Sequence, residues 1–175
     1  MKNQNTKNII KILLVVILVT LVVIYRFIPK QTKNVNAKFI ILHTYVNYAW
    51  GTQFNGKAIY EDGSIYTWND IDDILLKKYE IGTPNGIKDF IKNEATLSKT
   101  KIDKKDLLKI KESVSILKDT IKFSSIGADQ GTTTISVINE NNNEIILKQT
   151  GDRVGENKSK EAQRILKILE KYDKK

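Results

Sequence analysis

A long apolar run near the amino terminus constrains this chain more than any other feature. Residues 12–25 read ILLVVILVTLVVIY without a charge, and apolar side chains extend the run to residues 9–28. A helix of about 20 residues rises roughly 30 Å, which matches the hydrocarbon core of a bilayer. Lys11 and Arg26 lie near its ends, where long basic side chains reach the lipid headgroups. We therefore expect residues 9–28 to form a transmembrane helix whose partner is the lipid bilayer.

The residues that follow the apolar run indicate whether it is removed. They read YRFIPK from Tyr25 to Lys30 and contain no small-residue cleavage pattern. The run therefore predicts an uncleaved signal anchor, preceded by a cytoplasmic tail at residues 1–8. Lysines on its two sides nearly balance, so the charge rule does not fix the orientation. A short tail before a long domain favours an extracytoplasmic carboxyl-terminal domain, and the expected location is the cell membrane, as a single-pass protein.

The composition excludes several classes of site. The chain has no cysteine and one histidine, His43, which excludes a disulfide scaffold, a thiolate metal site and a cysteine nucleophile. The net charge is +9, but only Arg26, Arg153 and Arg164 are arginines among the 29 basic residues. Proteins that read bases and phosphates specifically rely on arginine forks. We therefore expect a lysine-coated surface and no nucleic-acid partner.

The rest of the chain carries strand signals at both ends. Residues 29–38 are polar and lysine-rich and predict a tether, followed by a domain at residues 39–175. The strand that begins at Phe39 is apolar on both faces at its start. Asp62 and Gly63 between two β-rich runs predict a hairpin with a two-residue turn that pairs Tyr60 with Ile65 and Lys57 with Trp68. The sequence NENNN between TTTISVI and EIILKQ predicts a second hairpin.

Helix signals lie between and after these hairpins. Each predicted helix has a capping residue at its amino end followed by apolar residues at helical spacing. The caps are Asn69 or Asp70 for a helix to about Tyr79, Thr83 before Pro84, Asp103, and Ser159 for the last helix. The predicted fold class is α+β: an amino-terminal transmembrane helix, then an antiparallel sheet of about five strands with a helical insert and a carboxyl-terminal helix.

Aromatic residues crowd into the first predicted hairpin and the strand before it. Tyr48, Trp50, Tyr66 and Trp68 are the candidate ligand-binding residues, because aromatic faces on a small sheet can stack on a sugar, a peptide or a headgroup. The alternative is that these rings pack against one another in the core. Both possibilities fit the spacing.

The remaining candidate sites are weaker. His43 would need a carboxylate brought to it by the fold before it could act as an acid or a base. Asp152 and Glu156 are a candidate carboxylate pair for glycoside hydrolysis. The loop that holds them does not match the spacing of an EF-hand calcium-binding loop. Asn157 begins a glycosylation pattern that also fits a helix cap. We expect no cofactor and no metal site.

The segment AWGTQFNGKAIYEDGSIYTW, together with GENKS before the final helix, resembles uncharacterised small membrane-anchored or secreted proteins of Gram-positive bacteria. The residues that carry the resemblance are Trp50, Gly51, Gly56, Asp62, Gly63, Ile65, Tyr66 and Gly155 to Ser159. The resemblance implies a location and an architecture, and it supplies no catalytic residues.

Together these observations predict a single-pass membrane protein whose exposed domain binds an envelope protein, a peptide or a glycan. A binding protein is favoured over an enzyme, because no nucleophile with an adjacent base is recognisable. One alternative is an envelope hydrolase that uses Asp152 and Glu156. The other is a cytoplasm-facing regulator that associates with nucleic acid through its lysine-rich helices.

Overall fold

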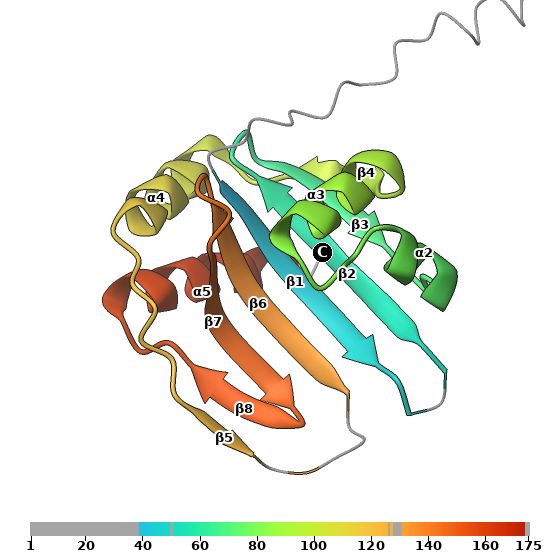
Figure 1. Cartoon of the computed structure of the whole chain (residues 1–175). Helices are drawn as coiled ribbons and strands as arrows, with labels where there is room; N and C mark the ends of the chain where they lie inside the picture. The colour runs from blue at the N-terminus through green and yellow to red at the C-terminus, as the bar shows by residue number, and fades with distance from the viewer. Residues whose placement is uncertain (1–38, 50, 126, 128–130, 174–175) are drawn as a thin grey trace, which may run out of the picture. The chain divides into compact units, whose positions relative to one another are not determined.

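The computed structural model describes residues 39–49, 51–125, 127 and 131–173 (Figure 1). Within these residues, no helix combines the length and the apolar character needed to cross a membrane. The predicted tail, anchor and tether, at residues 1–8, 9–28 and 29–38, lie outside the described residues.

The described residues are built on one antiparallel sheet of eight strands, in the order β4-β3-β2-β1-β6-β7-β8-β5. The strands are β1 (Phe39–Asn47), β2 (Gln53–Tyr60), β3 (Ser64–Trp68), β4 (Thr96–Lys101), β5 (Phe123–Ser125), β6 (Thr132–Asn139), β7 (Glu144–Gly151) and β8 (Arg153–Glu156). The helices are α2 (Asp73–Lys78), α3 (Pro84–Asn93), α4 (Lys104–Ser115) and α5 (Lys160–Asp173).

The predicted fold class is wrong, because the sheet has eight strands rather than about five and more of the described residues lie in strands than in helices. The strands that the sequence did not reveal are β4, β5 and β8. β4 and β5 are the two edges of the sheet and β8 lies next to β5. Their sequences, TLSKTK, FSS and RVGE, are short and largely polar, so they lack the apolar alternation that marks a half-buried strand.

The first hairpin forms where expected, but its register differs by one residue. Ile59 pairs with Ile65 and Gly56 with Trp68, so the predicted pairs of Tyr60 with Ile65 and Lys57 with Trp68 are wrong. The turn spans Glu61, Asp62 and Gly63, with φ +81° at Gly63 and a hydrogen bond from Gly63 N to Tyr60 O at 2.9 Å. A three-residue turn that ends in a left-handed glycine replaces the two-residue turn and moves every side chain after it to the other face.

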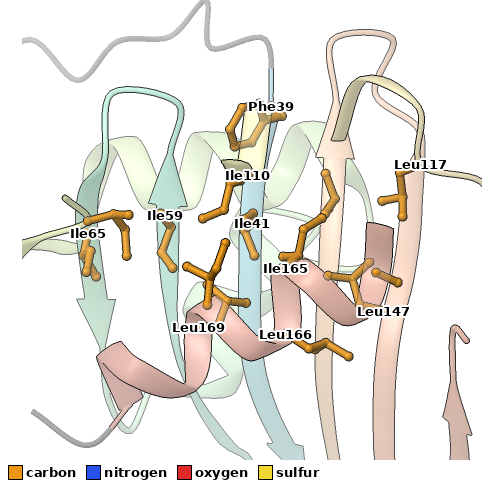
Figure 2. Close-up of a cluster of buried hydrophobic side chains, with 14 residues drawn as sticks. Phe39, Ile41, Ile59, Ile65, Ile110, Leu117, Leu147, Ile165, Leu166 and Leu169 are labelled. Carbon is orange, nitrogen blue, oxygen red and sulfur yellow. The ribbon is translucent and has the colours of Figure 1, made fainter. Parts of the chain in front are cut away.

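The helices lie on opposite faces of the sheet. In Figure 1, α2 and α3 lie in front of the strands β1 to β3, and α4 and α5 lie behind the sheet. Figure 2 shows the core beneath α4 and α5, where Ile110, Ile165 and Leu169 meet Ile41 and Leu147. A second core, described below, fills the space under α3. β1 faces both cores: Ile40 belongs to one and Ile41 to the other, as its apolar sequence predicted.

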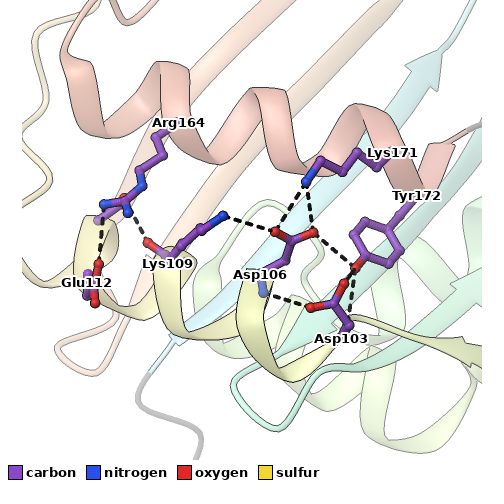
Figure 3. Close-up of polar contacts among 8 residues, drawn as sticks. Asp103, Asp106, Lys109, Glu112, Arg164, Lys171 and Tyr172 are labelled. Carbon is purple, nitrogen blue, oxygen red and sulfur yellow. Dashed lines mark hydrogen bonds and ion pairs between the residues drawn. The ribbon is translucent and has the colours of Figure 1, made fainter.

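A polar cluster joins α4 to α5 (Figure 3). Asp103 caps α4, and its carboxylate accepts a hydrogen bond from the Tyr172 hydroxyl at 2.8 Å. Asp106 is only 5% exposed, and its carboxylate accepts two hydrogen bonds from Lys171 Nζ, at 3.0 and 3.2 Å. Nearer the amino end of α5, Arg164 forms an ion pair with Glu112 of α4 at 3.3 Å. These side chains are paired with one another, so the cluster fixes the two helices.

Candidate functional site

The predicted aromatic residues do not form a common surface. Tyr66 and Trp68 are buried, at 6% and 4% exposure, beneath α3. The Trp68 ring lies 5.5 Å from the ring centres of both Phe54 and Phe90. Tyr48 is 71% exposed, and Trp50 lies outside the described residues. Of the predicted candidates, therefore, Tyr66 and Trp68 pack in the core and Tyr48 is the one that the structure places at the surface.

The Tyr66 and Tyr60 rings also face each other in this core. Their centres are 5.1 Å apart in an edge-to-face arrangement. Burial raises the pKa of Tyr60 to about 12, with a smaller contribution from Tyr66, so its hydroxyl stays protonated at neutral pH. The pair therefore packs as neutral aromatic side chains.

Tyr48 lines a groove between the helical insert and the sheet, which we call the α2–α3 groove. Its volume is about 460 Å³, within the range of ligand sites. The floor comes from the sheet and is mainly apolar, with Leu42, Thr44, Val46, Phe54 and Ile138. The wall comes from α2, the turn after it and α3, with Leu76, Ile81, Pro84 and Ile87. The sequence offered no signal for this groove, because its two sides are separated in the chain and meet only through the fold.

The wall of the groove is held by a tight joint between α2 and α3. Thr83 caps α3, accepting a hydrogen bond from Gly86 N at 3.0 Å, and Pro84 occupies the first turn as predicted. A Cβ at Gly86 would lie 1.9 Å from the carbonyl oxygen of Tyr79, so only glycine permits this approach. The Tyr79 ring packs 5.8 Å from Phe90, and its hydroxyl donates to Glu94 at 2.6 Å. The joint is therefore fixed by backbone contact and by the aromatic core.

The rim of the groove is mainly acidic. Asp73, Glu80 and Glu144 line it, together with a single cation, Lys77. Asp73 accepts a hydrogen bond from the Thr52 hydroxyl, and Glu144 accepts one from the Ser136 hydroxyl at 2.6 Å. Within the part of the chain that the structure describes, no hydrogen-bond donor reaches the Glu80 carboxylate. The rim therefore presents a surplus of negative charge around an apolar floor.

A contact near the groove links α3 to the β6–β7 turn. Lys88, next to the lining residue Ile87, donates a hydrogen bond through Nζ to the side chain of Asn142 in the β6–β7 turn. Burial lowers the pKa of Lys88. Tyr48, at the other side of the groove, lies just beyond the end of β1.

On the opposite face, the fold brings a carboxylate to His43. His43 Nδ1 lies 3.9 Å from Asp173 Oδ1 of α5, and Lys57 Nζ donates to the same oxygen. Burial, and secondly the charge of Lys57, lower the pKa of His43, while Asp173 opposes them. His43 and Asp173 border a cleft of about 580 Å³ beneath α5. Nothing in the local sequence predicts the partnership, since 130 positions separate His43 from Asp173.

Of the carboxylate pair considered for hydrolysis, Glu156 is not tuned as a glycosidase acid. A glycosidase acid must hold its proton near neutral pH, so its pKa must be raised. The pKa of Glu156 is instead lowered, first by a hydrogen bond from Gln163, at 2.7 Å, and then by Lys158. Asp152 follows the β7 strand and hydrogen-bonds Gly131 through its backbone. Among the described residues, no group of three or more potential metal ligands comes together.

Asn157 has a structural role in place of the glycosylation that its motif suggested. Its side chain is fully buried, accepts hydrogen bonds from Thr120 and from Ser159 N, and donates to the carbonyl of Lys118. A buried amide cannot carry a glycan. Ser159 caps α5, as predicted, by accepting from Ala162 N at 3.2 Å.

The α2–α3 groove is thus the site that the geometry favours, and Tyr48 is the predicted residue that belongs to it. Comparisons with models of protein families, with curated proteins and with solved structures yield no match to this chain.

Proposed function

We propose that this protein is a single-pass membrane protein, anchored by residues 9–28, whose sheet domain binds an envelope protein or peptide in the α2–α3 groove. The observation that carries the proposal is the apolar lining of the groove, where Val46, Leu76 and Ile81 stay partly exposed beside the exposed ring of Tyr48. Exposed apolar surface rimmed by polar residues is typical of sites that bind proteins or ligands. Ile74, on α2 next to the groove residue Asp73, is exposed as well.

The distribution of charge supports an anchored binding protein over a nucleic-acid regulator. Residues 39–173 contain as many acidic as basic residues. All nine surplus positive charges lie outside them, at Lys2, Lys7, Lys11, Arg26, Lys30, Lys33, Lys38, Lys174 and Lys175. A domain without net positive charge has no overall electrostatic attraction to phosphate backbones. Basic residues that flank an apolar run suit the headgroups of a membrane.

Photo-crosslinking in intact cells tests the groove. p-Benzoylphenylalanine would replace Tyr48, an exposed aromatic residue in the groove, in full-length protein expressed at native level. The matched control places the same group at Leu108, which is 53% exposed on α4. We expect a discrete adduct with one envelope protein or peptide from position 48 and none from position 108. Equal adducts from both positions, or none from position 48, would contradict binding in the groove.

A labelling experiment tests the location. The chain has no cysteine, so Lys175→Cys introduces a unique thiol. We expect a membrane-impermeant maleimide to label this thiol on intact cells and the protein to stay in the membrane fraction after alkaline extraction. Labelling only after the cells are opened would place the domain in the cytoplasm. Release by alkali would contradict the anchor.

A further inference from the structure

The α2–α3 groove combines features that specify the chemistry of its occupant. We propose that it binds an amphipathic cationic peptide, whose apolar side chains enter the groove and whose lysine or arginine residues face Asp73, Glu80 and Glu144. The inference rests on the proposed function and goes further, because it names the class of partner.

The length of the groove favours a peptide over a compact small molecule. Leu42, Thr44, Val46 and Tyr48 all line it and are alternate residues along β1 and its continuation. With a rise of about 3.3 Å per residue, the row from Leu42 to Tyr48 spans roughly 20 Å. A volume of about 460 Å³ spread over that length is a trough. A trough accommodates a row of side chains from one segment, as in the binding of an amphipathic segment to an apolar groove.

The charges at the rim favour a cationic segment. The rim carries three carboxylates and one ammonium group, although residues 39–173 as a whole are neutral. The Glu80 carboxylate has no hydrogen-bond or ion-pair partner among the described residues, so it is available to a basic side chain. An anionic bilayer or a nucleic acid would meet like charge at this rim, which disfavours both as occupants.

The open strands beside the groove provide polar contacts for the rest of the segment. Thr44 pairs with Thr134 of β6, and Thr134 pairs with Gln149 of β7, so these side chains share the face that bears the groove. All three side chains are partly exposed. A segment bound in the groove would therefore have hydroxyl and amide groups along one side and carboxylates along the other.

The test uses the full chain in nanodiscs of phosphatidylcholine, with empty nanodiscs as background. The probes are a labelled 14-residue amphipathic peptide of leucine and lysine, its counterpart with glutamate for lysine, and an isomer with its residues reordered so that no apolar face forms. We expect the first peptide to bind measurably tighter than the other two, with an affinity that falls as salt is added. Equal binding of the glutamate peptide would overturn the proposal.

Variants that change the charge at the rim test whether the peptide binds in the groove. Glu80→Gln with Glu144→Gln should weaken binding of the leucine-lysine peptide by about threefold to tenfold, since exposed ion pairs each contribute modestly. Lys77→Gln should strengthen binding by about twofold to fivefold for the same reason. Glu161→Gln with Glu170→Gln is the matched control on α5 and should change nothing. Unchanged affinity in the groove variants would overturn the proposal.

A variant that blocks the groove distinguishes the proposed function from the proposed preference for a cationic peptide. Thr44→Trp places a bulky ring on the floor of the groove, and Thr133→Trp places one on the opposite face as its control. If Thr44→Trp abolishes the crosslink at position 48 but the two charged peptides bind equally, the proposed function stands and the cationic preference fails. If the crosslink and peptide binding are both unaffected by Thr44→Trp, both fail. Displacement of the peptide by dihexanoyl phosphatidylglycerol, and not by the phosphatidylcholine analogue, would assign the groove to anionic lipid and overturn the peptide.

Discussion

The two faces of the sheet are covered in different ways. On one face, α4 and α5 bury eight residues between them and are joined by the Asp106 cluster. On the other, α3 buries four residues and the six-residue α2 buries none. The first face is therefore closed by two long helices that are tied together. The second is closed only under α3, and the groove opens where α2 fails to bury a side chain.

The closed face therefore contributes mainly to stability, whereas the face that bears the groove is the one available for binding. Residues that close a core are selected for tight packing, whereas a groove keeps apolar groups in contact with water at a cost of roughly 25 cal/mol per Å². The cost is small enough to be offset by the closed face and by the aromatic core under α3. The comparison therefore predicts large effects of substitution in both cores and small effects at the exposed residues of the groove.

The largest effect should come from the aromatic core under α3. Phe90 is fully buried and its ring contacts Phe54, Trp68 and Tyr79. We expect Phe90→Ala to lower the free energy of unfolding by about 3–5 kcal/mol, as measured by urea denaturation. Ile165→Ala, in the core beneath α5, should cost about 2–5 kcal/mol. If Phe90→Ala cost less than about 1 kcal/mol, the face that bears α3 would lack a packed core.

A smaller effect should come from the buried amide of Asn157, in the loop before α5. Asn157→Ala removes hydrogen bonds to Thr120, Ser159 and the carbonyl of Lys118. Leaving such buried groups unpaired costs about 1–3 kcal/mol. The same denaturation experiment measures it, with the exposed turn residue Asn141→Ala as control. Equal stability of the two variants would show that hydrogen bonds at Asn157 do not hold the closed face.

The free energy of unfolding should also depend on pH through His43, which lies on the closed face. The pKa of His43 is lowered from 6.5, mainly by burial, so the folded state prefers the neutral imidazole. The unfolded chain then binds the proton more readily, and stability is lost as the pH falls from about 6.5 through the folded pKa. We expect the free energy of unfolding to decline between about pH 7 and pH 5, and to decline less in His43→Gln. A steeper decline in the variant would show that Asp173 outweighs burial.

Local chemistry made part of the fold predictable. The caps at Thr83, Asp103 and Ser159 and the proline at position 84 were confirmed, because each acts on backbone groups within four residues. The apolar first half of β1 correctly predicted a strand with a core on both faces. Both hairpins formed where turn residues separate β-rich runs.

The rest depended on contacts between distant residues. β4 is polar and joins the sheet by pairing with β3, and just after it Ile102 N donates to Gly63 O at 2.9 Å, in the turn whose length was predicted wrongly. The one-residue change in that turn also decided which aromatic rings point under α3. The groove requires the α2–α3 joint to meet β1, and Glu144 reaches it from a strand over sixty positions later than Glu80. No local sequence pattern predicts contacts between residues so far apart in the chain.

The smallest effect on stability should come from the exposed residues in and beside the groove. Tyr48 is mostly exposed and Thr134 lies on the open strands, so Tyr48→Ala and Thr134→Val should each change the free energy of unfolding by no more than about 0.5 kcal/mol. Peptide binding by Tyr48→Ala, measured in the nanodisc assay, should nonetheless fall, because the ring supplies part of the apolar surface of the groove. This combination separates a binding residue from a packing residue, since a packing role would lower stability and binding together. If Tyr48→Ala destabilised the fold as much as Asn157→Ala, the groove would be part of the core and the two faces would be equivalent.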